Sequence, residues 1–212
     1  MSKGIIIAIE GIDGSGKTTI AKNLKRELEN KGLNVVLLKE PTDSIIGKEI
    51  RKILATNPNP DQRKMMELYA KDRKINVEKN IEPALRENKI VILDRYVISS
   101  LAYQSTNGIP YEEILQENSF APIPDMVIIL DLPEEIAVQR LVASGKNVDS
   151  FEKREFLKKV RGRYKDLSKK LKTFKGWEKT KIYLIDATKS VEEITKNVLE
   201  NVLDLLKERK II

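Results

Sequence analysis

The chain has 212 residues, a formal net charge of +7, and neither cysteine nor histidine. The lack of both residue types excludes disulfides, thiolate and imidazole metal sites, cysteine nucleophiles and a histidine general base. The length is enough for one sizeable hydrophobic core, so we expect a single domain over residues 1–212. Any chemistry must therefore use carboxylates, lysine, arginine and a hard metal ion.

The positive charge is concentrated in residues 153–181, where thirteen Lys and Arg side chains accompany three acidic ones. A solvated helix face, an electrostatic funnel for phosphate-rich nucleotides and a nucleic-acid surface all fit this segment. The segment shows no pattern of aromatic residues interleaved with the basic ones that would support a nucleic-acid surface. We therefore do not expect a nucleic-acid partner. We find no signal-peptide pattern, and the longest apolar runs are strand-sized, so we expect a cytoplasmic protein with no membrane partner.

Short apolar runs alternate with amphipathic, helix-like segments along the whole chain. The runs are residues 5–9, 35–38, 90–93, 126–130 and 182–185. Such runs are typical of buried parallel strands, and the alternation implies right-handed crossovers. We therefore predict an α/β fold, a three-layer α/β/α arrangement with a five-stranded parallel sheet.

The first apolar run leads into a complete G-x-x-x-x-G-K-[ST] phosphate-binding loop. In this motif glycines let backbone N–H groups surround phosphates, while Lys17 reaches the β and γ oxygens and Thr18 can bind Mg²⁺. The motif places the predicted sheet in the P-loop NTPase type. We expect this segment to bind nucleotide phosphates through Gly11, Ile12, Asp13, Gly14, Ser15, Gly16, Lys17, Thr18 and Thr19.

Polar residues follow the second and third predicted strands, at the sheet edge where α/β proteins bind ligands. Asp94 follows the third run, where a carboxylate either caps a helix or, as a Walker-B acid, holds Mg²⁺ directly or through water. Arg95 comes next, and its guanidinium suits either a structural ion pair or a nucleotide phosphate. Upstream, Tyr69 and Arg73 lie four residues apart on one helical face. On its own this spacing is more typical of surface packing, but it also suits stacking on a base and binding a carbonyl oxygen.

The combined motifs resemble the thymidylate kinase family in order and over most of the chain. The matching segments are EGIDGSGKTT (10–19), LYAKDR (68–73), DRY (94–96), Ser99, AYQ (102–104), DSFE (149–152) and VRGRY (160–164). The resemblance implies transfer of the ATP γ-phosphoryl group to dTMP, with Mg²⁺ on the phosphates. It also implies a homodimer with ATP and dTMP as its ligands.

The resemblance further assigns the acceptor site. The implied substrate-binding residues are Asp13, Glu40, Thr42, Arg51, Tyr69, Arg73, Arg95, Ser99, Tyr103 and Gln104. By similarity, Tyr69 would stack on thymine, Arg73 would bind its O4, and Gln104 would meet the base edge. The remaining roles concern the sugar and the phosphate.

In the same comparison Asp13 would contact the sugar 3′-hydroxyl, and Arg95 would hold the acceptor phosphate. Tyr103 would crowd the sugar C2′ and so disfavour ribose. On the donor side the resemblance places ATP adenine beside Arg140, Ala187 and Lys189. The implied catalytic residues are Lys17, Asp13, Arg95 and Lys146, and the implied metal ligands are Thr18 and Asp94.

The chain departs from the family at two places. Tyr69 stands where the usual aromatic residue is phenylalanine. The family also places a transition-state arginine either in the phosphate loop, where this chain has Gly14, or in a flap, here at about residues 143–152. Since the flap has no arginine before Arg154, we expect Lys146 to act instead, with Arg154 or Arg140 as alternatives.

Two other functions remain open from the motifs. A broader pyrimidine nucleotide or deoxynucleoside kinase would use the same phosphate loop and the same Asp94-Arg95 pair. A nucleotide-switched, nucleic-acid-binding ATPase would use residues 153–181 as its contact surface. The latter leaves Tyr69, Arg73 and Tyr103 without a role.

Overall fold

The computed structural model describes residues 4–57, 60–145 and 151–212, and the strands in these ranges form one parallel sheet. They are β1 Ile5–Gly11, β2 Val35–Lys39, β3 Ile90–Asp94, β4 Met126–Asp131 and β5 Lys181–Asp186. Their spatial order is β2-β3-β1-β4-β5. Each predicted apolar run therefore forms a strand, and the predicted parallel sheet is confirmed.

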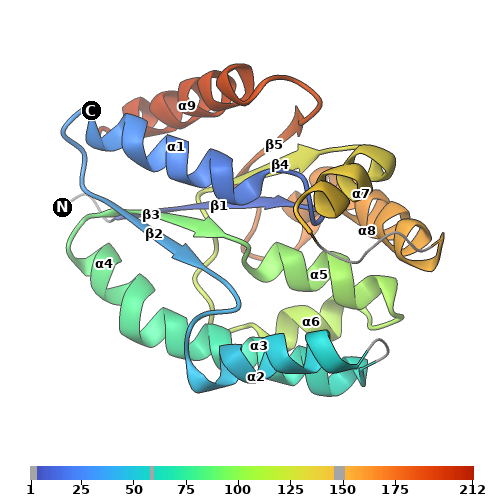
Figure 1. The fold of residues 1–212 in the computed structure, drawn as a ribbon. Helices are drawn as coiled ribbons and strands as arrows, with labels where there is room; N and C mark the ends of the chain where they lie inside the picture. The colour runs from blue at the N-terminus through green and yellow to red at the C-terminus, as the bar shows by residue number, and fades with distance from the viewer. Residues whose placement is uncertain (1–3, 58–59, 146–150) are drawn as a thin grey trace.

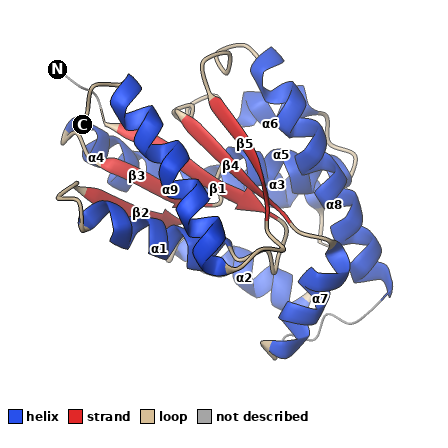
Figure 2. Ribbon diagram, turned by 90° about the horizontal axis from the view of Figure 1, so that it is seen from above, coloured by secondary structure: helices blue, strands red, loops and turns tan. Residues whose placement is uncertain are grey.

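Helices cover both faces of the sheet (Figure 1). One face is covered by α1 Lys17–Glu29 and α9 Val191–Glu208. The other is covered by α3 Gln62–Asn76, α4 Glu82–Arg86, α5 Val97–Thr106 and α8 Phe151–Lys170, with a π-helical turn, Val77–Ile81, joining α3 to α4. Figure 2 shows α9 lying across the strands and α8 on the far side of the sheet. The three-layer prediction is confirmed.

Three further helices extend the second layer. They are α2 Ile45–Thr56, α6 Tyr111–Glu117 and α7 Glu134–Ala143, which pack on α3, α5 and α8 respectively. A 3₁₀ turn, Leu171–Thr173, ends α8. None of the described helices is long and apolar enough to cross a membrane.

The register of the strands decides where the polar loops meet. β1 is central, and its Ile9 lies opposite Asp94 of β3, while Lys39 of β2 also lies opposite Asp94. Because these strands are parallel, their carboxyl ends reach the same edge of the sheet. The phosphate loop after β1 is therefore placed beside the residues that follow β2 and β3.

Helix α8 packs along the second face through one apolar stripe. Leu157, Val160, Tyr164, Leu167 and the following Leu171 are buried against the core. This is the stripe that the 3.6-residue periodicity predicts. The hydroxyl of buried Tyr164 lies 3.0 Å from Glu10 in β1, the strand that leads into the phosphate loop.

Candidate active site

The phosphate loop connects β1 to α1 in a tight turn. Gly16, the N-cap of α1, has a φ of 92°, which is left-handed and favours glycine. Buried Lys17 turns back, and its Nζ donates to the carbonyl oxygens of Gly11 (3.0 Å) and Ile12 (2.8 Å). Burial lowers the pKa of Lys17 to about 7, with the nearby Arg95 guanidinium acting in the same direction. The ammonium thus occupies the loop that is built to surround phosphate.

A second feature of the loop is the close packing at Gly14. Its φ is 82°, and a Cβ added there would lie 2.6 Å from the backbone oxygen of Ala137 in α7. Any larger residue would have to displace the backbone of α7. This loop position is therefore closed to a side chain.

Thr18 and Asp94 form a pair of oxygen donors at the edge of the sheet. The Thr18 hydroxyl donates to Asp94 Oδ2 at 2.5 Å, and buried Asp94 Oδ1 has no hydrogen-bond partner among the described residues. Lys39 Nζ lies 3.3 Å from Thr18 Oγ1 and 3.5 Å from Asp94 Oδ2. An unpartnered carboxylate oxygen beside a hydroxyl fits Mg²⁺, which takes few protein ligands and completes its shell with water and phosphate.

No cluster of three or more acidic side chains that could hold a metal ion occurs in ranges 4–57, 60–145 and 151–212. The sheet edge therefore lacks the ligands of an all-protein cation cage. It fits an ion that arrives with a polyphosphate.

Arg95 lies between the phosphate loop and α5. Its guanidinium donates to Asp13 Oδ1 through a short hydrogen bond, to Ser99 Oγ at 3.2 Å and to the Tyr103 hydroxyl at 3.5 Å. It also lies 5.2 Å from the centre of the Tyr103 ring. The Tyr103 hydroxyl in turn accepts from the backbone N–H of Asp13 at 3.1 Å. The predicted loop residue and the predicted acceptor residues are thus in direct contact.

Arg73 of α3 is buried rather than presented on an open helix face. It is 1% exposed and pairs with Glu40, with both Nε and Nη2 lying 2.8 Å from Glu40 Oε2. It also donates to Asn118 Oδ1 and to Ser100 Oγ, the latter at 3.2 Å. Burial raises the pKa of Glu40, and the Arg73 charge acts against that increase. The pair fixes one edge of the guanidinium.

Tyr69 and Gln104 come from α3 and α5, the helices that also contribute Arg73 and Ser99. Tyr69 is half-buried and packs against the small cluster of Ile50, Met65 and Leu68. Gln104 is 3% exposed, and its Oε1 has no hydrogen-bond partner within the described part of the chain. A buried unpartnered acceptor needs an explanation, and a ligand N–H supplies one.

The segment after β2 is organised by Asp72, which the sequence analysis did not assign. Buried Asp72 accepts from the Thr42 N–H (2.7 Å), the Thr42 hydroxyl (2.6 Å) and the Ser44 hydroxyl (2.6 Å). Arg51 donates to the carbonyl oxygens of Pro41 (2.9 Å) and Thr42 (2.7 Å). Thr42 and Arg51 thus lie together on one braced loop beside Glu40.

The residues expected around adenine form a separate group. Arg140 Nη2 donates to the Ala187 carbonyl at 3.3 Å, while Lys189 is exposed on the loop after β5. Lys146 lies outside the described residues, so the structure gives no position for it. Arg154, at the start of α8, is exposed but has interactions with its surroundings.

Sequence analysis also missed Glu10, the charged residue inside apolar β1. It is 0% exposed and accepts from the Tyr96 N–H (2.7 Å), the Ser99 hydroxyl (2.6 Å) and the Tyr164 hydroxyl (3.0 Å). Burial raises the pKa of Glu10, while the Ser99 hydrogen bond and the Arg95 charge lower it. A carboxylate in an otherwise apolar strand was the available signal.

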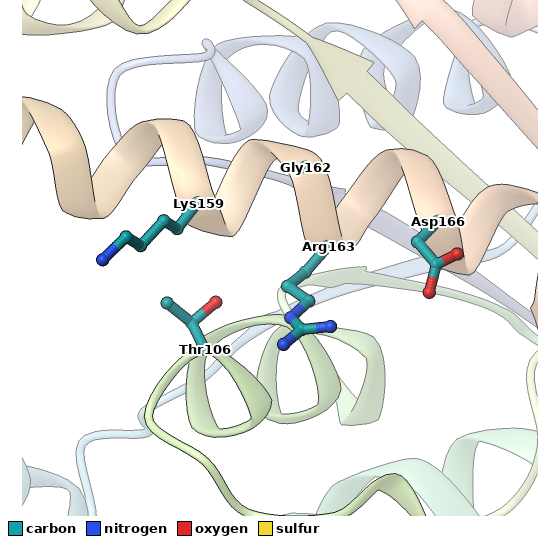
Figure 3. A pocket seen from close by; sticks show the side chains of 5 residues that line it. All are labelled: Thr106, Lys159, Gly162, Arg163 and Asp166. Atoms are coloured by element: carbon teal, nitrogen blue, oxygen red, sulfur yellow. The ribbon is translucent and has the colours of Figure 1, made fainter.

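A groove of about 300 Å³ lies elsewhere, between the end of α5 and the middle of α8 (Figure 3). It is lined by Thr106, Lys159, Gly162, Arg163 and Asp166. None of these five was predicted as a site residue. Of the predicted residues, the phosphate loop, Asp94 and Arg95 lie instead at the carboxyl edge of the sheet.

The fold and the edge of the sheet define a P-loop nucleotide kinase, with the polar residues Arg95, Ser99 and Tyr103 beside the phosphate loop. Comparison with known proteins agrees with that class. Residues 9–198 match the thymidylate kinase family. The chain belongs to this family, as its motifs predict.

Individual relatives match over nearly their full length. A probable thymidylate kinase of Pyrococcus abyssi is 41% identical over 203 residues, covering 93% of this chain and 95% of the relative. A thymidylate kinase of Desulfotalea psychrophila is 38% identical, with 96% of each chain covered. A probable thymidylate kinase of Archaeoglobus fulgidus is 41% identical, covering 96% of this chain and 98% of the relative.

Proposed function

We propose that the protein transfers the γ-phosphoryl group of ATP to dTMP and releases dTDP and ADP. Its membership of the thymidylate kinase family establishes the class of enzyme, an ATP-dependent nucleoside monophosphate kinase. The observation that supports the residue assignment best is the contact of Asp13, in the phosphate loop, with both Arg95 and Tyr103. It joins a donor site to an acceptor site at one edge of the sheet.

On the donor side, the backbone of residues 11–16 and Lys17 bind the ATP phosphates. Lys17 exchanges its two loop carbonyl partners for phosphate oxygens. Thr18 and Asp94 hold Mg²⁺, which neutralises phosphate charge when it is bound. Arg140, Ala187 and Lys189 enclose the adenine, in agreement with the hydrogen bond that already joins the first two.

On the acceptor side, Arg95 holds the dTMP phosphate in line with the γ-phosphorus. An acceptor oxygen forms the new P–O bond as the bond from the γ-phosphorus to the β–γ bridging oxygen breaks, and ADP leaves with that oxygen. This reaction depends on positioning and charge more than on a strong base, which suits a chain without histidine. Asp13 binds the sugar 3′-hydroxyl, Ser99 supports Arg95, and Tyr103 crowds C2′.

The base is read by three residues from two helices. Tyr69 stacks on thymine, Arg73 donates to O4, and the unpartnered Gln104 Oε1 accepts from N3–H. The Glu40 carboxylate fixes Arg73 on its protein side, so little freedom remains to be lost on binding. Thr42 and Arg51 complete the acceptor loop.

The proposal includes the domain organisation and the source of the catalytic cation. The chain acts as one kinase domain with a flap at about 143–152, and Lys146 supplies the cation that arginine supplies in relatives. The closed position at Gly14 supports a cation from the flap rather than from the loop. The active form is a cytoplasmic homodimer.

The test is a coupled assay of ADP formation with Mg²⁺–ATP and a panel of acceptors: dTMP, dUMP, UMP, dCMP and thymidine. We expect dTMP to give the highest kcat/KM. UMP, which brings a 2′-hydroxyl against Tyr103, should be poorer by about 10- to 200-fold. Lys17→Met should abolish turnover with every acceptor. A preference for UMP or for thymidine would contradict the acceptor assignment.

A further inference from the structure

Glu10 is a buried carboxylate that none of the steps above uses. It lies in β1 between two residues whose side chains are apolar or absent, and it is inaccessible to solvent. A buried carboxylate is costly unless donors surround it. Here the donors come from three places along the chain, the start of α5, its first turn and α8.

One carboxylate oxygen of Glu10 accepts a hydrogen bond from the backbone next to Arg95. Arg95 has a φ of 74°, a left-handed backbone conformation that residues other than glycine rarely adopt. The chain on either side is held by β1: the Arg95 N–H donates to the Ile9 carbonyl at 3.1 Å, and the Tyr96 N–H donates to Glu10 Oε1 at 2.7 Å. Glu10 therefore supplies the second of two anchors for the strained residue.

The other oxygen controls the Arg95 side chain through Ser99. The Ser99 hydroxyl donates to Glu10 Oε2 at 2.6 Å, and the same oxygen atom of Ser99 accepts from Arg95 Nη1 at 3.2 Å. This arrangement orients the lone pair of Ser99 toward the guanidinium. Tyr164 also donates to Glu10 at 3.0 Å, and its hydroxyl lies 3.0 Å from Ser99 Oγ, but no hydrogen bond joins Tyr164 to Arg95 directly among the described contacts.

We infer that Glu10 is a positioning residue for Arg95, fixing its backbone through the Tyr96 N–H and its guanidinium through the Ser99 hydroxyl. The inference rests on the proposed role of Arg95 in holding the acceptor phosphate. Its consequence is specific: Glu10 matters for binding the phosphate of dTMP and not for binding the nucleoside.

The experiment measures binding of dTMP and of thymidine, by calorimetry without ATP, to wild type and to Glu10→Gln. Thymidine lacks only the phosphate, so the ratio of the two affinities isolates the contribution of the phosphate, which Arg95 is proposed to hold. Glu10→Gln should lower dTMP affinity by about 10-fold and change thymidine affinity by less than about 2-fold. Ser99→Ala, which leaves the carboxylate in place, should shift the ratio in the same direction.

Tyr164→Phe is the control, because it removes a hydroxyl that lies 3.0 Å from both Glu10 Oε2 and Ser99 Oγ but keeps the hydrogen bonds of Tyr96 and Ser99 to Glu10 and of Arg95 to Ser99. Its ratio should stay within about 2-fold of wild type. Arg95→Gln should lower dTMP affinity by about 30-fold or more, and adding Glu10→Gln to it should cause no further loss.

The outcomes separate the two proposals. If Arg95→Gln leaves the ratio unchanged, the assignment of Arg95 to the acceptor phosphate is wrong. If Arg95→Gln lowers the ratio but folded Glu10→Gln and Ser99→Ala do not, the positioning role of Glu10 is wrong. Loss of dTMP and thymidine binding to the same extent in Glu10→Gln would also overturn it.

Discussion

The perturbed pKa of Lys17 predicts that nucleotide binding takes up a proton. In the ligand-free protein, burial lowers the pKa of the Lys17 ammonium to about 7. Polyphosphate oxygens placed around the same group favour its charged form and return the pKa toward the ordinary lysine value. Binding and protonation are therefore linked, and protons favour the complex.

The size of the linkage follows from that pKa. At pH 8 about a tenth of a group with a pKa near 7 is charged, so complex formation should take up roughly 0.9 proton per site. Protons are taken up rather than released because the pKa of Lys17 is higher in the ATP complex than in the ligand-free protein. ATP affinity should be greatest below about pH 7 and should fall by up to about 10-fold for each pH unit above it.

The assay is calorimetric titration with Mg²⁺–ATP at pH 8, without acceptor, in two buffers that differ in ionisation enthalpy. The difference in observed enthalpy gives the number of protons exchanged. Lys17→Arg is the matched control, because a guanidinium stays charged at this pH and should take up no proton. Parallel titrations from pH 7 to pH 9 give the slope of affinity.

Uptake of less than about 0.2 proton by wild type at pH 8, together with an ATP affinity independent of pH, would show that Lys17 is already charged in the ligand-free protein. Equal proton uptake by wild type and by Lys17→Arg would assign the linkage to another group.

Two further predictions concern stability. Arg73→Met leaves Glu40 buried without its partner and should lower the free energy of unfolding by about 3–5 kcal/mol, whereas Arg86→Met, at an exposed pair, should cost less than about 1 kcal/mol. Thermal unfolding measures both, and equal melting temperatures would contradict the buried-pair argument. Gly14→Ala should destabilise more than Gly32→Ala, since both glycines have positive φ but only Gly14 meets backbone; the reverse order in chemical denaturation would disprove the clash.

The sheet could be predicted from the sequence because its signals are local. Each buried strand is a continuous apolar run, and the phosphate loop is one contiguous motif whose glycines serve backbone geometry. The meeting of the loop with Asp94 also followed, since parallel strands end at a common edge. The structure adds the 2.5 Å contact of Thr18 with that carboxylate.

The polar network behind the site could not be predicted in the same way. Arg73 was recognised from its spacing to Tyr69, yet its partner Glu40 is 33 residues away and Asn118 is 45 residues away. No periodicity relates such positions, because the fold alone brings them together. Asp72 was visible within a matching motif, but its hydrogen bonds to the loop after β2 depend on how α3 packs.

The most direct measurement of the central claim is transfer of label from [γ-³²P]ATP in the presence of dTMP and Mg²⁺, with separation of the products. The account predicts that label moves from ATP into dTDP, one phosphoryl group for each ADP formed. Label recovered only as inorganic phosphate, or transferred to another nucleotide while dTMP is ignored, would contradict it.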